Sequence, residues 1–193
     1  MISLQFVNGN VLDIAADAIL LTVDGMAKGM EGNIARAFAR RWPDIWDKVK
    51  EEIPYPLPYG SVFDYEPDDP DCPFKLVLIA SLLPHREVTA PAQKGFIRSS
   101  FDAVLRCALH DYRLASLAAP LLKCGWRLSA QEELLAMIDA VDAPGVKGLS
   151  GVVSIATLDA AEYDQLNPII KSMGFHTDVT QAAKFDRIQE KGT

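Results

Sequence analysis

Apolar and polar positions along the chain follow two spacings, which predict strands and helices in alternation. Continuous apolar runs of strand length occur at residues 18–23 and 76–80, as in strands covered on both faces. Shorter strand-like segments lie at 3–7, 61–65, 116–120 and 151–158. Apolar side chains recur at helical spacing over 34–42, 44–52, 97–112, 130–141 and 160–173. This alternation predicts a three-layer α/β/α domain.

Turn and cap signals agree with these boundaries. Ser129 followed by Glu132 has the spacing of a capping box at the start of the 130–141 helix. No internal repeat or linker divides the chain, so we expect one domain over residues 1–174. Residues 175–193 are polar and are expected to form a tail or an extra helix.

Composition and charge narrow the class of protein. Of the 193 residues 49% are hydrophobic and 23% are charged, which excludes a disordered chain. The net charge of -7 argues against a broad nucleic-acid surface but allows a local anion pocket. No apolar run approaches the ~20 residues that span a membrane, and no signal peptide is visible, so a cytoplasmic location without a membrane partner is expected.

Cysteine and histidine positions indicate no metal chemistry. Cys72, Cys107 and Cys124 lack the spacing of zinc ligands, and the three histidines are scattered. We therefore expect no metal site, no disulfide framework and no bound cofactor.

Glycine-rich or polar turns follow several of the expected strands. They comprise residues 9–10, 25–32 and 123–127. Ligands of open α/β sheets bind outside the carboxyl ends of the strands, where glycines let backbone N–H groups approach a phosphate. A tight turn without ligand explains the same glycines, and spacing alone leaves both readings open.

In the order of its motifs the chain resembles the macro domain family. The motifs are GNVL at 9–12, DAIL at 17–20, GMEGNIA at 29–35, SLAAPLLKCG at 116–125 and SIATLDAAEY at 154–163. Within that family, residues 34–43, 124–125 and 136–139 are most similar to the branch that removes ADP-ribose from carboxylate side chains or from DNA. The resemblance covers about residues 1–173 and implies a macro-domain-like sandwich with a mixed central sheet.

What the resemblance implies is recognition of ADP-ribose or of an ADP-ribosylated macromolecule. Asn10 would face the adenine amino group, where many relatives have aspartate, because an amide oxygen can accept the same hydrogen bond. The segment with Gly29, Gly32, Asn33 and Ile34 would line the diphosphate and distal ribose on one side. The opposite side would consist of Leu122, Lys123, Cys124, Gly125 and Trp126.

The sequence departs from the family where hydrolytic members carry their chemistry. Asp24 replaces an asparagine that positions the distal ribose, and Glu31 stands where those members have a water-activating aspartate. A lysine of the closer branch becomes Ser81 or its neighbour, and no aspartate follows Cys124 and Gly125. Asp24 and Glu31 are thus the candidate catalytic acids.

Two acids beside a diphosphate repel it unless cations compensate. Lys28 and Lys123 are the nearest candidates in sequence. Three hypotheses remain: a module that binds ADP-ribose or a related nucleotide, an ADP-ribosyl hydrolase acting on protein or DNA, and a decayed crevice that serves as a protein-interaction domain.

Overall fold

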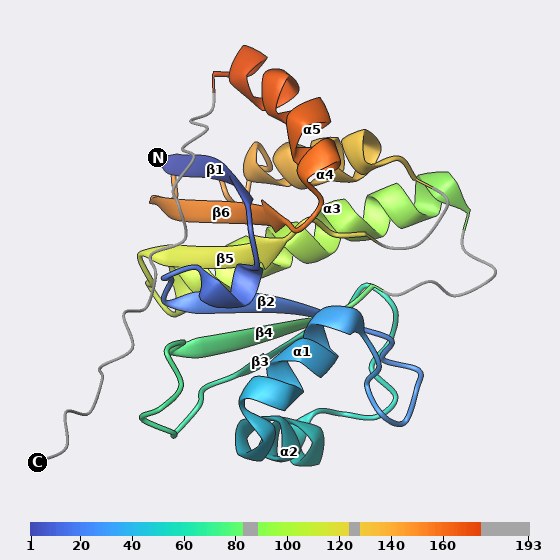
Figure 1. Cartoon of the computed structure of the whole chain (residues 1–193), viewed down its shortest axis with the longest axis vertical. Helices are drawn as coiled ribbons and strands as arrows, with labels where there is room; N and C mark the ends of the chain where they lie inside the picture. The colour runs from blue at the N-terminus through green and yellow to red at the C-terminus, as the bar shows by residue number, and fades with distance from the viewer. Residues whose placement is uncertain (83–88, 124–127, 175–193) are drawn as a thin grey trace, which may run out of the picture.

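The computed structural model describes residues 1–82, 89–123 and 128–174, which build one sheet between two layers of helices (Figure 1). The strands are β1 (Ile2–Asn8), β2 (Ala18–Val23), β3 (Val62–Tyr65), β4 (Leu76–Ser81), β5 (Ser116–Pro120) and β6 (Gly151–Thr157). Their order across the sheet is β1-β6-β5-β2-β4-β3. Neighbouring strands are parallel except β3, which runs antiparallel to β4 at the edge. The sheet is therefore mixed, as expected.

Helices cover both faces of the sheet, which confirms the predicted α/β/α sandwich (Figure 1). On one face lie α1 (Asn33–Arg41) and α2 (Pro43–Glu52). On the other lie α3 (Ala90–Arg106), α4 (Ala130–Val141) and α5 (Ala160–Ser172). A short 3-10 turn, Val11–Asp13, follows β1.

The apolar run of β2 is continuous because both of its faces are buried. Leu20 packs in the cluster formed with α3, α4 and α5. Its neighbours Ile19 and Leu21 pack in the other cluster, with α1 and α2. Successive side chains of a strand point to opposite faces, so one strand supplies both cores. The 18–23 strand lies where the pattern predicted it.

The first half of α3 differs from the sequence prediction. The helix begins at Ala90, whereas apolar spacing predicted a start at residue 97. Thr89 caps it by accepting the Ala92 N–H, and Pro91 stands in the first turn, where a missing N–H costs nothing. Gln93 is the one residue of the six from 90 to 95 that is buried, so these turns have no apolar stripe.

At the amino end of β2, one carboxylate joins three segments. Asp17 accepts hydrogen bonds from the Ala115 N–H and the Ser116 hydroxyl, both at 3.0 Å. Lys75 Nζ lies 2.8 Å from the other carboxylate oxygen. The Lys75 contact is the largest cause that holds the pKa of Asp17 below its ordinary value, against the opposing effect of burial. Asp17 therefore ties the starts of β2, β4 and β5 together.

The predicted polar tail, residues 175–193, lies outside the described residues. In the part of the chain that the structure describes, no helix combines the length and the apolar character needed to cross a membrane.

Candidate ligand-binding cleft

A cleft opens at the carboxyl edge of the sheet, where β1, β6 and β5 end side by side. Its volume is about 190 Å³. The described residues that line it are Gly9, Asn10, Val11, Ile34, Pro120, Leu121, Lys123, Ala156, Thr157, Leu158 and Asp159. Most of these side chains are apolar, and the polar ones come from the carboxyl end of β6 and from the segments just after the strands. The cleft thus lies where ligands bind in open α/β sheets.

Asn10 forms the end of the cleft that follows β1. Its side-chain oxygen accepts the Leu12 N–H at 3.1 Å and caps the 3-10 turn. A backbone N–H can only donate, so the amide oxygen faces Leu12. Asn10 is therefore held in place by its own chain.

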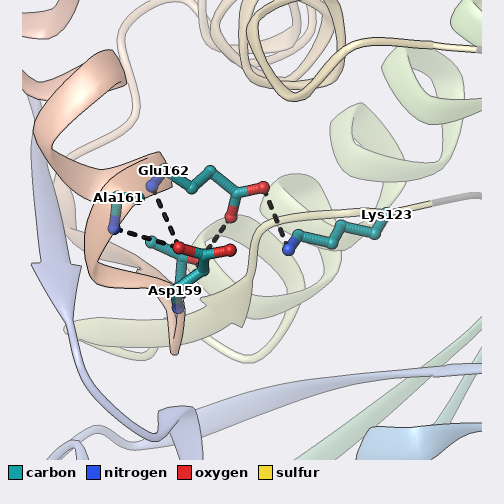
Figure 2. A network of polar contacts seen from close by, with 5 residues as sticks. Lys123, Asp159, Ala161 and Glu162 are labelled. Atoms are coloured by element: carbon teal, nitrogen blue, oxygen red, sulfur yellow. Dashed lines mark hydrogen bonds and ion pairs between the residues drawn. The ribbon is translucent and has the colours of Figure 1, made fainter.

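A polar network lies at the carboxyl end of β6, the strand beside β1 (Figure 2). Asp159 caps α5, because one of its carboxylate oxygens accepts the N–H groups of Ala161 and Glu162 at 3.0 and 3.1 Å. Glu162 accepts the Thr157 hydroxyl at 2.5 Å through Oε2. Its other oxygen lies 2.9 Å from Lys123 Nζ. The network joins the end of β5 to the start of α5.

The 24–31 loop is closed by backbone contacts. Asp24 and Glu31 form an isolated antiparallel bridge, in which the Asp24 N–H donates to the Glu31 carbonyl at 2.6 Å. The Asp24 carboxylate accepts the Met26 N–H at 3.0 Å and stabilises the turn. Residues directly opposite in an antiparallel pair present their side chains on the same side. The fold therefore brings the two candidate acids together.

Gly25 fixes this loop against the body of the domain. Its N–H donates to the Ser81 hydroxyl at 3.2 Å, and its carbonyl accepts the Leu57 N–H at 3.0 Å. A Cβ at Gly25 would lie 2.3 Å from the Leu57 carbonyl oxygen. Only glycine fits so close to a neighbouring backbone. Ser81, which the resemblance places at or beside the lysine position of the closer branch, is buried, and its hydroxyl accepts the Gly25 N–H.

Comparison with known proteins then places the fold. No protein-family model matches the chain, and no curated protein sequence matches it. Solved structures do match. The macrodomain of Thermus aquaticus DarG superposes with a TM-score of 0.62 at 22% identity, covering 81% of this chain and 99% of that one.

Two structures of the Oceanobacillus iheyensis macrodomain also match, each with a TM-score of 0.72. One is a mutant with ADPR, 15% identical over 87% of this chain and 91% of that chain. The other is the macrodomain with ADP, 14% identical over 86% and 88%. This chain has the macro domain fold.

Within this macro domain the residues expected to bind ligand are distributed unevenly around the cleft. Asn10, Ile34 and Lys123 line it. Gly32 is the buried residue that precedes α1, whereas Gly29 and Asn33 are exposed beside it. Leu122 is fully buried in the core formed with α3, α4 and α5, so its side chain faces away from solvent. The remaining three, Cys124, Gly125 and Trp126, lie outside the described residues.

Lys123 has a partner that the sequence did not suggest. It was considered as a cation for Asp24 and Glu31, but its ammonium group pairs with Glu162. Lys28, the other candidate, is exposed in the 24–31 loop.

Among the described residues no group of three or more His, Cys, Asp or Glu side chains is placed to hold a metal ion.

Part of the macro domain cleft was missed in the sequence. Thr157, Leu158 and Asp159 line it, yet the sequence placed them only in the strand-like segment at 151–158 and in the motif at 154–163. Their position at the carboxyl end of a strand could have identified them, as it identified the other turns. They are the last residue of a buried parallel strand and the two residues after it, at the same sheet edge as the other turns.

Proposed function

We propose that this macro domain binds ADP-ribose or a related nucleoside diphosphate in the cleft at the carboxyl ends of β1, β5 and β6. The observation that carries the proposal is the position of the cleft. It lies beside the start of α1, in a fold whose solved neighbours include a macrodomain with ADPR and one with ADP. The net charge of -7 does not oppose this, because backbone N–H groups can bind an anion without a basic surface.

The lining suits the parts of such a ligand. Val11, Ile34 and Leu158 offer apolar contact to the faces of a base. Asn10 offers an amide to its polar edge. The backbone around Gly32 leads into α1, and the N-terminus of a helix favours the negative charge of a diphosphate. Binding thus relies on shape and backbone dipoles more than on cationic side chains.

Isothermal titration calorimetry with ADP-ribose tests this proposal. We expect saturable binding of one ligand per chain, and weaker binding of adenosine, which lacks the diphosphate. A folded protein that releases no heat at millimolar ADP-ribose would contradict the proposal. That result would favour the third hypothesis, a protein-interaction domain with a decayed crevice.

A second candidate function is hydrolysis of an ADP-ribosyl bond on protein or DNA. The bridge between Asp24 and Glu31 favours it, because two carboxylates on one side of a loop can divide the tasks of activating water and orienting the ribose. Turnover would be assayed on ADP-ribosylated protein and on ADP-ribosylated DNA. We expect Glu31→Gln to lower the rate by roughly 100-fold or more if Glu31 activates the water. Unchanged turnover in that variant would reject the assignment.

A further inference from the structure

Lys123 is the only cationic side chain among the described residues that line the cleft. Its side chain is 51% exposed, so it can change partner without unpacking the core. In the structure its ammonium group contacts Glu162 at 2.9 Å (Figure 2). The cation that an anionic ligand would use is therefore already engaged.

Glu162 is held more firmly than Lys123. Its side chain is 13% exposed, and it keeps the Thr157 hydroxyl as a donor at 2.5 Å. It also stands in the first turn of α5, where the helix dipole stabilises a negative charge. The carboxylate thus retains two stabilising interactions when Lys123 moves away.

The ion pair itself is weak. Pairs between partly exposed side chains contribute little to stability, because water screens them and the long side chain of lysine must be ordered. A diphosphate in the cleft carries more negative charge than one carboxylate. It can therefore compete for the same ammonium group at small cost.

We propose that Glu162 is a positioning residue that sets the affinity of the cleft for diphosphates by holding Lys123. When a nucleoside diphosphate binds, Lys123 leaves Glu162 and contacts the phosphate oxygens. With the diphosphate absent, Glu162 neutralises the charge of Lys123. This inference rests on the proposed function, and it assigns to α5 a role that the sequence motifs did not suggest.

The test is calorimetry of ADP-ribose and adenosine on Glu162→Gln. Glutamine still accepts the Thr157 hydroxyl through its amide oxygen but cannot hold an ammonium ion as a carboxylate does. We expect ADP-ribose to bind roughly threefold to fivefold more tightly at low ionic strength, an amount typical of a partly exposed ion pair. Adenosine affinity should not change.

Asp164→Asn is the matched control. Asp164 is an exposed acid on the same helix, outside the cleft lining, and its replacement changes the net charge equally. We expect no change in either affinity. A gain as large as that of Glu162→Gln would show a general charge effect and overturn the inference.

Lys123→Met removes the ammonium group and leaves the half-buried Glu162 carboxylate in place. We expect weaker ADP-ribose binding, unchanged adenosine binding, and no gain from adding Glu162→Gln to it. A gain that persists in the double variant would show that Glu162 acts by direct repulsion and overturn the role of Lys123. If the wild type binds ADP-ribose and neither Glu162→Gln nor Lys123→Met changes its affinity, this inference is overturned and the proposed function stands. A wild type that fails to bind ADP-ribose overturns the proposed function and the inference together.

Discussion

The backbone N–H of Asp24 donates to the carbonyl oxygen of Glu31 at 2.6 Å, and this bridge closes the 24–31 loop. The loop is therefore a turn closed by its own backbone, which is one of the two interpretations that the glycine spacing left open. Its shape depends on Gly25, which lies between Leu57 and Ser81. These backbone contacts fix the positions of the two candidate catalytic acids, Asp24 and Glu31.

We expect Gly25→Ala to destabilise the fold by about 1–3 kcal/mol, the usual cost of forcing an extra carbon into a packed site. The new Cβ would lie 2.3 Å from the Leu57 carbonyl oxygen and 2.5 Å from Ser81 Oγ. Gly29→Ala is the control, since the nearest atom to its Cβ is the Glu31 Cγ at 3.7 Å. Urea unfolding measures the free energy of unfolding of the two variants. Equal stability of Gly25→Ala and Gly29→Ala would contradict this account of the loop.

Leu158 offers a test of the cleft that leaves the core untouched. Its side chain lines the cleft and is 74% exposed. We expect Leu158→Ala to weaken ADP-ribose binding by roughly threefold to tenfold through lost apolar contact, with an unchanged melting temperature. Met173→Ala, which removes an exposed apolar side chain outside the cleft lining, should leave the affinity as it is. Equal effects of the two substitutions would place the ligand elsewhere.

Asp24→Asn separates the charge of Asp24 from its structural role. Asparagine can still accept the Met26 N–H through Oδ1, so the turn should persist. The resemblance to macro domains implies that Asp24 lies near the diphosphate, so removing its negative charge should tighten ADP-ribose binding roughly twofold to fivefold at low salt. Asp71→Asn, at an exposed acid in the turn before β4, should have no effect. Weaker binding by Asp24→Asn would show that the carboxylate itself contacts the ligand.

The ionisation of Asp17 should make the free energy of unfolding depend on pH. We expect Asp17→Asn to lower the free energy of unfolding by about 1–3 kcal/mol at pH 7, because one side-chain oxygen cannot replace three carboxylate contacts. The pKa of Asp17 is lowered in the folded state, chiefly by Lys75, so the stabilisation is complete above the unfolded pKa of about 3.9. It is lost as the pH falls through the lower folded value.

Urea unfolding of wild type and Asp17→Asn between pH 7 and about pH 3 checks this. The difference between the two proteins should shrink as the pH falls toward the acid end. A difference that stays constant over this range would show that the ionised carboxylate is not the source of the stabilisation.

Much of the fold could be predicted because burial on both faces leaves a continuous apolar run, as in β2 and β4. The start of α4 was predicted for a similar local reason, since Ser129 and Glu132 form the capping box that their spacing indicates. The early turns of α3 could not be found in this way. Between residues 90 and 95 they bury Gln93 and no apolar side chain. The apolar spacing therefore gives no sign of a helix there.

The candidate site could be predicted only as far as local signals reach. Asn10 lies in a polar turn after a strand, and the resemblance to macro domains implied a ligand contact for this residue, which lines the cleft. The Lys123–Glu162 pair could not be found, because it depends on β5 and β6 being neighbours in the sheet. The bridge between Asp24 and Glu31 also depends on how the loop folds back, which the glycine count does not reveal.

The most direct test of the central claim is an amide NMR titration of the ¹⁵N-labelled chain with ADP-ribose. We predict saturable shifts for the amides at the carboxyl edge of the sheet, among them Asn10, Ile34 and Asp159. The amides near Asp17 and Ser116, at the opposite edge, should not move. Shifts confined to that opposite edge, or a spectrum of folded protein that does not change at millimolar ADP-ribose, would contradict the account.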